Sequence, residues 1–256
     1  MASPAPVHAI DWGSLIPPNQ WETYSCVLDR VQAEGLDFAL GGGLAVGLYT
    51  GNPRNTKDLD IYIKPNDRDA VIAIMTDCGL TDYYETLPYD RAWIYRGNRE
   101  DVIVDAIWAM ANKRASVDES WLSRGTMIRI FDKQVRILAP EELIWSKLYV
   151  MQRDRCDWPD VLNLLAATGS HLDWQHLLKQ VAEDKLLLKG LLSIFSWVSP
   201  EQAMSIHRRV WSSLGLSFPT VAHDPEGRPS RPALLDSRPW FCEKSSADPL
   251  PLVAAR

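Results

Sequence analysis

The stretch from residue 41 to residue 60, GGGLAVGLYTGNPRNTKDLD, decides the fold that we expect for this chain. A glycine triplet follows a short apolar run, and Asp58 and Asp60 stand where the apolar strand LDIYI begins. Alternate side chains of a strand share a face, so the two carboxylates point the same way, with Cα atoms about 7 Å apart. Paired oxygen ligands suit Mg²⁺, and glycines let backbone N–H groups approach a phosphate closely. The stretch therefore predicts a metal-assisted phosphate site, while a solvated strand end is the alternative for the aspartate pair alone.

A third carboxylate, Asp105, lies inside the apolar segment EDVIVDAIWAM at residues 100–110. Aspartate is depleted in strand interiors and is seldom fully buried without a partner. We therefore expect Asp105 to lie on a strand beside Asp58 and Asp60, where three carboxylates could hold two Mg²⁺ ions about 4 Å apart. An aspartate that is hydrogen-bonded at a β-bulge is the alternative.

The rest of the chain divides by pattern into a mixed N-terminal part and a helical C-terminal part. Apolar periodicity predicts strands at 36–40, 59–63, 91–96, 100–110, 127–131 and 134–138, and helices at 18–34, 43–49 and 67–78. We expect the strands at 91–96 and 100–110 to be joined by a turn at Gly97-Asn98. From Ala139-Pro140 to about Leu214 the pattern is helical, and prolines then become frequent. The prediction is an α+β fold with a sheet-bearing domain over residues 1–138, a helical domain over 139–214 and a Pro-rich extended tail over 215–256.

Composition is that of an ordinary globular protein, with 46% apolar and 23% charged residues in a chain of 256. No apolar run approaches the roughly 20 residues that span a bilayer, and the N-terminus lacks the features of a secretory signal. The four cysteines are scattered without a CxxC pair, which predicts neither a zinc site nor a disulfide framework and indicates the reducing cytoplasm. A net charge of −6 weakens the case for an RNA substrate without excluding it, because a local basic patch can bind an RNA end.

The glycines GGGLAVGL, the pattern Arg54-x-Thr56-x-Asp58-x-Asp60 and a later strand aspartate together resemble the nucleotidyltransferase superfamily built on the DNA polymerase beta-type palm. That superfamily combines a glycine pair, an Asp-x-Asp/Glu pair and a third carboxylate downstream. The Gly-Gly form is similar to the branch that holds aminoglycoside-type transferases and AbiEii-like toxin enzymes. The resemblance covers about residues 36–165.

A second segment, SKLYVMQRDRCDWPDVLNLL at residues 146–165, resembles the AbiEii-type stretch of a lysine, a following arginine and Asp-x-x-Asp before an apolar helix. The resemblance implies that Lys147 contacts the triphosphate and that Asp157 has a supporting role. The sequence departs from that pattern at Cys156, where a basic residue usually stands. The alternatives are a solvated helix lysine for Lys147 and a helix N-cap for Asp157.

The resemblance implies a palm with a mixed sheet and a transfer that depends on Mg²⁺, with two ions and with Mn²⁺ as a substitute. A nucleoside monophosphate would pass from an NTP such as ATP to a hydroxyl group, with release of pyrophosphate. Catalysis and metal binding would fall to Asp58, Asp60 and Asp105. Nucleotide binding would fall to Gly42, Gly43, Arg54, Thr56, Lys147 and Asp157.

Three acceptor hypotheses remain open. The AbiEii-like match favours an RNA end such as tRNA, in a cytoplasmic toxin with an antitoxin protein as partner and no membrane partner. The glycine pair equally admits a small hydroxylated molecule such as an aminoglycoside antibiotic, and the acidity of the chain slightly favours a small molecule or a protein acceptor. A catalytically silent module that only binds nucleotide is the alternative from another class, although intact carboxylates speak against it.

Overall fold

The computed structural model of the protein describes residues 5–55, 58–221, 230–236 and 241. Its strands span Phe38–Leu40 (β1), Asp58–Ile63 (β2), Thr81–Asp82 (β3), Ile94–Arg99 (β4), Val102–Ile107 (β5), Met127–Ile130 (β6) and Lys133–Arg136 (β7). The first five form one sheet in the order β1-β2-β5-β4-β3, and β6 and β7 form a separate hairpin. β2 and β5 run parallel whereas the other neighbours run antiparallel, so the central sheet is mixed.

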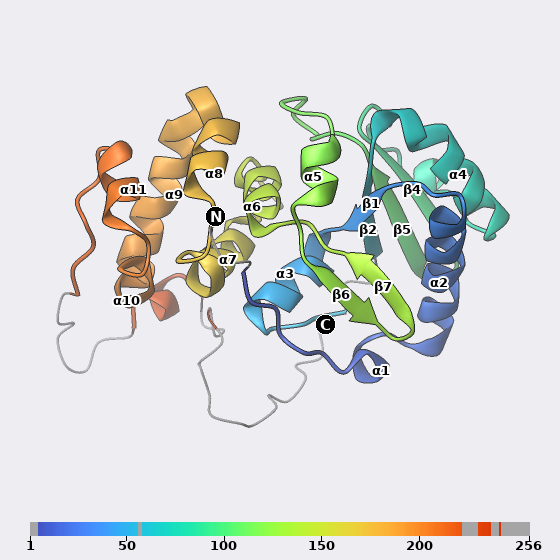
Figure 1. Ribbon diagram of the computed structural model, residues 1–256, viewed down its shortest axis with the longest axis horizontal. Helices are drawn as coiled ribbons and strands as arrows, with labels where there is room; N and C mark the ends of the chain where they lie inside the picture. The colour runs from blue at the N-terminus through green and yellow to red at the C-terminus, as the bar shows by residue number, and fades with distance from the viewer. Residues whose placement is uncertain (1–4, 56–57, 222–229, 237–240, 242–256) are drawn as a thin grey trace.

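Helices flank this sheet and make up most of the described chain after β7 (Figure 1). The α-helices span Trp12–Leu15 (α1), Pro18–Ala33 (α2), Gly42–Thr50 (α3), Arg68–Asp77 (α4), Glu119–Ser123 (α5), Pro140–Leu148 (α6), Trp158–Thr168 (α7), Trp174–Val181 (α8), Lys185–Val198 (α9), Pro200–Ala203 (α10) and Arg208–Ser213 (α11). Short 3₁₀ helices span Pro65–Asp67 (η1), Tyr83–Glu85 (η2), Ala182–Asp184 (η3) and Pro232–Leu234 (η4). Figure 1 shows α2 and α4 at one side of the molecule and α8 to α11 at the other. Between them, α6 and α7 pack against α3, which joins the helical part to the sheet.

The local structure between β1 and β2 follows directly from its residues. α3 ends at Gly51, whose φ of 71° lies in the left-handed region that glycine adopts without strain. On β2, Leu59 and Ile61 are 2% and 0% exposed and enter the core. Asp58 and Asp60 alternate with them, so their side chains lie on the opposite face of the sheet.

The mixed sheet with its helices confirms the expected α+β class. Helix α6 begins at Pro140, close to the expected change from sheet to helices. The division into three domains stays a prediction, and most of the Pro-rich segment 215–256 lies outside the described residues. No helix in the described part of the chain is long and apolar enough to cross a membrane.

The expected turn at Gly97-Asn98 is wrong. β4 continues through these residues, Arg99 pairs with Val102, and the chain therefore turns at residues 100–101. Glycine at position 97 has a packing role, because a Cβ there would come within 2.8 Å of the Met75 side chain of α4. The close approach of a helix to the strand can explain this glycine without a turn.

The expectation that the chain holds no disulfide is also wrong. Cys26 on α2 and Cys78 at the end of α4 form a disulfide, with their Cα atoms 5.9 Å apart. Their distant positions in the sequence gave no sign of it, because the pairing depends on the packing of α2 against α4. Among the described residues, Cys156 is a free and exposed cysteine.

Reduction of the Cys26–Cys78 disulfide should lower the free energy of unfolding by about 4 kcal/mol, because the bond closes a long loop in the unfolded chain. Urea unfolding with and without dithiothreitol measures the difference. The double variant Cys26→Ser/Cys78→Ser should behave like the reduced protein under both conditions. Cys156→Ser is the matched control and should keep the full response to reduction; equal stability of the oxidised and reduced wild type would contradict the disulfide.

Candidate active site

Three carboxylates and one guanidinium group lie along one face of the sheet. In the strand register, Asp60 of β2 lies beside Asp105 of β5, and Asp105 lies beside Arg96 of β4. Asp58 shares the face of Asp60 because it stands two residues earlier on β2. The three aspartates expected from the sequence are therefore neighbours, and Arg96 extends their row.

Arg96 fixes the orientation of Asp105. Its Nε donates a hydrogen bond to Oδ1 of Asp105 at 2.8 Å, and its Nη2 donates to Oδ2. Asp105 is 1% exposed and lies in a regular ladder, so the β-bulge alternative is wrong. Burial raises the pKa of Asp105, and the hydrogen bonds from Arg96 offset part of that rise. A bidentate pair of this kind restricts both side chains to one geometry.

Sequence reasoning missed Arg96 because it misplaced the turn. In an antiparallel hairpin, the numbers of paired residues have a constant sum. The turn at residues 100–101 pairs Asp105 with Arg96, whereas the turn expected at 97–98 would have paired it with Asp90. A correct turn assignment would have identified this partner.

The start of α3 lies directly against Asp60. The Gly41 N–H donates to the backbone carbonyl oxygen of Asp60 at 2.9 Å. A Cβ on Gly42 would come within 1.6 Å of Oδ2 of Asp60, and the φ of Gly42 is 57°. Only glycine combines that conformation with so close a contact. Gly43 follows in the first turn of α3, whose free N–H groups suit a phosphate.

The carboxylates on this face repel one another. Burial, followed by the charges of Asp105 and Asp58, raises the pKa of Asp60 to about 7. Lys147 and Arg96 lower that pKa without cancelling the rise. Burial is thus the first cause of the raised pKa of Asp60, and the like charges beside it are the second.

A divalent cation fits part of this donor set. Among the described residues, no group of three or more His, Cys, Asp and Glu side chains could hold a metal ion as placed. Both oxygens of Asp105 already accept hydrogen bonds from Arg96. Asp58 and Asp60 provide two hard oxygen ligands on one face of β2, which suits a Mg²⁺ ion that completes its shell with substrate phosphates and water.

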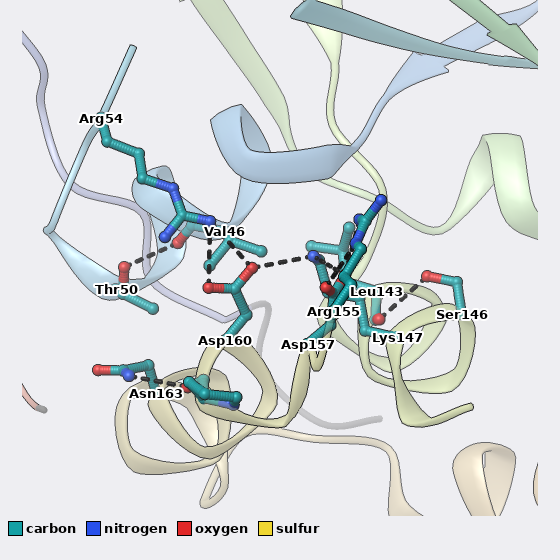
Figure 2. Close-up of polar contacts among 11 residues, drawn as sticks. Val46, Thr50, Arg54, Leu143, Ser146, Lys147, Arg155, Asp157, Asp160 and Asn163 are labelled. Carbon is teal, nitrogen blue, oxygen red and sulfur yellow. Dashed lines mark hydrogen bonds and ion pairs between the residues drawn. The ribbon is translucent and has the colours of Figure 1, made fainter. Parts of the chain in front are cut away.

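A second charged cluster connects α6, α7 and the segment before β2 (Figure 2). We call it the Lys147 cluster; its members are Arg54, Lys147, Arg155, Asp157 and Asp160. Lys147 Nζ donates to Oδ2 of Asp157 at 2.7 Å and to Oδ2 of Asp160 at 2.9 Å. Arg54 Nη2 lies 3.2 Å from Oδ2 of Asp160, and Arg155 Nε lies 2.9 Å from Oδ1 of Asp157. Figure 2 shows the Asp160 carboxylate between the side chains of Arg54 and Lys147.

The structure decides between the readings of Lys147 and Asp157. Lys147 is 8% exposed, so the solvated helix lysine is wrong. Asp157 stands before α7 but its side chain makes no capping hydrogen bond. Burial acts to raise the pKa of Asp157, and the bonds from Arg155 and Lys147 outweigh it and hold the pKa below its ordinary value. Asp160 was missed as a site residue, although the Asp-x-x-Asp spacing sets two side chains on neighbouring positions of a helix surface.

Both clusters border one cavity of about 510 Å³. That volume lies within the range of small-molecule sites. Thr56, one of the expected nucleotide-binding residues, lies outside the described residues. The other expected site residues all line the cavity, namely Gly42, Gly43, Arg54, Asp58, Asp60, Asp105, Lys147 and Asp157. Their catalytic and binding roles stay predictions.

Comparison with known proteins places this geometry in context. A family model described as "Uncharacterised nucleotidyltransferase" matches residues 20–195, more than half of the chain. A search of curated proteins finds no match.

Several solved structures are similar at low sequence identity. The antibiotic-resistance factor ANT(2'')-Ia has a TM-score of 0.45 at 16% identity, over 69% of this chain and 96% of that chain. The lincosamide antibiotic adenylyltransferase LnuA has a TM-score of 0.42 at 17% identity, over 59% and 97%. A nucleotidyltransferase-like protein from Paracoccidioides brasiliensis has a TM-score of 0.35 at 18% identity, over 70% and 94%. Scores this low carry no argument about substrate.

Gly42→Ala should destabilise the protein by about 1–3 kcal/mol, because it forces a side chain into the left-handed region and against the Asp60 carboxylate. Thermal or urea unfolding checks the stability, and calorimetry with ATP checks the phosphate site. Gly190→Ala on α9 is the matched control, since a Cβ there would lie 3.9 Å from the Trp158 ring, an ordinary van der Waals contact. That control should be neutral or slightly stabilising, and a Gly42→Ala protein as stable as the wild type would refute the close contact.

Asp60→Asn should stabilise the metal-free protein increasingly as the pH rises. The pKa of Asp60 is raised to about 7 in the folded state, so folded protein holds a proton that unfolded protein has lost, and stability falls from about pH 4 up to pH 7. Between pH 5 and pH 8 the advantage of the variant should grow by about 2–3 kcal/mol. Urea unfolding at several pH values with a chelator measures it.

Asp77→Asn is the control for this trend, since Asp77 is a mostly exposed carboxylate on α4. The stability difference between this control and the wild type should change little over the same pH range. A pH-independent difference between Asp60→Asn and the wild type would contradict the raised pKa of Asp60 in the folded protein.

Proposed function

This chain belongs to the nucleotidyltransferase family whose model it matches, and we propose on that premise that it uses Mg²⁺ to move a nucleoside monophosphate from an NTP to a hydroxyl acceptor. Pyrophosphate is the second product. One observation carries the proposal. Asp58, Asp60 and Asp105, the start of α3 and the Lys147 cluster all line the same cavity.

Each part of the cavity has a role in this proposal. Asp58 and Asp60 would hold Mg²⁺, with Mn²⁺ as a substitute, and the ion when bound would stabilise charge on the reacting phosphate. The backbone N–H groups of Gly42 and Gly43 would contact the phosphates. Asp105, oriented by Arg96, would face the acceptor hydroxyl and accept its proton. The sequence also predicted a second Mg²⁺ ion that includes Asp105 among its ligands. That second ion stays a prediction.

The Lys147 cluster would serve the triphosphate. Lys147 and Arg54 are cations that line the cavity, and Lys147 is nearly buried, which strengthens its interaction with a phosphate. Asp157 and Asp160 hold these cations in place through their ion pairs. ATP is the NTP that we propose first. The cytoplasm is the proposed location because NTPs are supplied there; the cysteines no longer support it, since Cys26 and Cys78 form a disulfide.

A small hydroxylated molecule is the acceptor that the geometry favours. The cavity volume of about 510 Å³ lies in the range of small-molecule sites, and the net charge of −6 disfavours a nucleic acid. An RNA end such as tRNA is the second candidate, because residues 146–165 resemble the AbiEii-type stretch. A toxin role and an antitoxin partner belong to that second candidate alone.

Incubation with Mg²⁺ and each labelled NTP should place label on an acceptor and release pyrophosphate. The acceptors to compare are buffer alone, total tRNA, tobramycin and lincomycin. Asp60→Asn should lower the rate at least about 100-fold, because it removes a ligand of the proposed ion from the reacting centre. Asp77→Asn should keep the wild-type rate.

Metal binding has a readout apart from activity. Mg²⁺ should raise the melting temperature of the wild type at pH 8 and leave that of Asp60→Asn nearly unchanged. NTP binding without pyrophosphate release from any acceptor would support the catalytically silent alternative instead.

A further inference from the structure

We propose that the acceptor is an uncharged, hydroxyl-bearing small molecule with an apolar body, bound against an apolar wall beside Asp105. This inference rests on the proposed nucleotidyl transfer and names the substrate class that the same cavity would select. The apolar wall consists of Trp93, Ile94, Ile107, Ala109 and Met110, all of which line the cavity.

The strand register places the wall next to Asp105. Ile94 of β4 pairs with Ile107 of β5, one row beyond the pair of Arg96 and Asp105 on the same face. On the cavity face, the charged pair of Arg96 and Asp105 is therefore followed, two residues away along each strand, by the apolar pair of Ile94 and Ile107. Trp93 precedes β4, and its carbonyl oxygen accepts a hydrogen bond from the Trp108 N–H at 3.1 Å, which holds this segment beside β5.

The order of the strands assigns the wall to the acceptor. Gly42 lies against Asp60 on β2, and the phosphates would bind there. Asp105 follows on β5, and β4 with Ile94 and Trp93 lies beyond it. An acceptor hydroxyl must approach the reacting phosphorus from the side opposite the leaving pyrophosphate. Its body would therefore lie on the β4 side of Asp105, against the apolar wall.

The charged groups of the cavity argue against a polycationic acceptor. Within the described residues that line it, five are carboxylates and four are cations. Asp105, Asp157 and Asp160 are each engaged by arginine or lysine. Asp58 and Asp60 are assigned to the metal ion in the proposed function. No carboxylate of this described lining is left to recognise the ammonium groups of an aminoglycoside.

The same pairing argues against an RNA end. The four cations are Arg54, Arg96, Lys147 and Arg155, and each lies in an ion pair with a carboxylate of the cavity. A bound triphosphate would take Lys147 and Arg54, and Arg96 and Arg155 keep their partners Asp105 and Asp157, so none of the four is left for the phosphodiester backbone of a second polyanion. An uncharged acceptor needs neither kind of partner, and apolar contact provides its binding energy.

Transfer assays with labelled ATP and Mg²⁺ test the acceptor class. The panel contains neutral apolar alcohols (a steroid alcohol and 2-naphthylethanol), a polycation (tobramycin) and total tRNA. Transfer to at least one neutral alcohol, with tobramycin and tRNA inactive, is the expected result. Transfer confined to tobramycin or tRNA overturns the inference and leaves the proposed nucleotidyl transfer standing, whereas ATP binding without transfer to any acceptor overturns both.

Trp93→Ala tests the wall directly. The KM for the neutral acceptor should rise about tenfold, as expected for the loss of one aromatic contact. The Kd for a non-hydrolysable ATP analogue, measured by calorimetry, should stay within about twofold of the wild type. Trp197→Ala, which removes a half-exposed tryptophan from α9, is the matched control and should change neither value. A weaker Kd for the ATP analogue in Trp93→Ala, with the KM for the acceptor unchanged, would assign the wall to the nucleobase and overturn the inference.

Discussion

Negative charges that share one face of a sheet repel each other, and the other features of this site depend on how that repulsion is balanced. Asp58, Asp60 and Asp105 lie on neighbouring strands, and the raised pKa of Asp60 reflects their mutual effect under burial. Arg96 compensates Asp105 from the next strand. Asp60 has α3 beside it, and a helix N-terminus is the end of a helix that stabilises negative charge. Arg96 offsets part of the cost of burying these aspartates, and Gly42 leaves room for the Asp60 carboxylate.

The three aspartates differ in how their charge is balanced, and this difference suits them to two different roles. Asp105 is held by a bidentate partner and is almost fully buried, so it can act in one orientation only. Asp58 and Asp60 lie on the cavity side of β2, where an added cation would reduce the repulsion. A metal ion bound as in the proposed function would therefore stabilise the fold as well as the reaction. Metal affinity and protein stability should respond together to changes on this face.

How far the sequence predicts the site depends on the range of each interaction. Asp58 and Asp60 could be placed on one face because strand alternation is local, and Gly42 could be placed in the site because glycine lets backbone N–H groups approach a phosphate closely. Arg96 depends on hairpin register, which a single misplaced turn changes. The partners of Lys147 and the Cys26–Cys78 bond depend on helix packing, for which one sequence carries no direct signal. The sequence was therefore enough to predict which kinds of residue form the site. The ion-pair and disulfide partners of the residues became known only from the fold.

The ion pairs around Lys147 have a consequence for the timing of a reaction cycle. In the absence of substrate, Asp157 and Asp160 occupy the lysine, and Asp160 also binds Arg54. In the proposed function, an incoming triphosphate would compete with these internal carboxylates for the same cations, so part of its binding energy would be spent on the exchange. The return of the carboxylates to the lysine would then favour the departure of pyrophosphate. The ion pairs would thus limit product inhibition at the expense of substrate affinity.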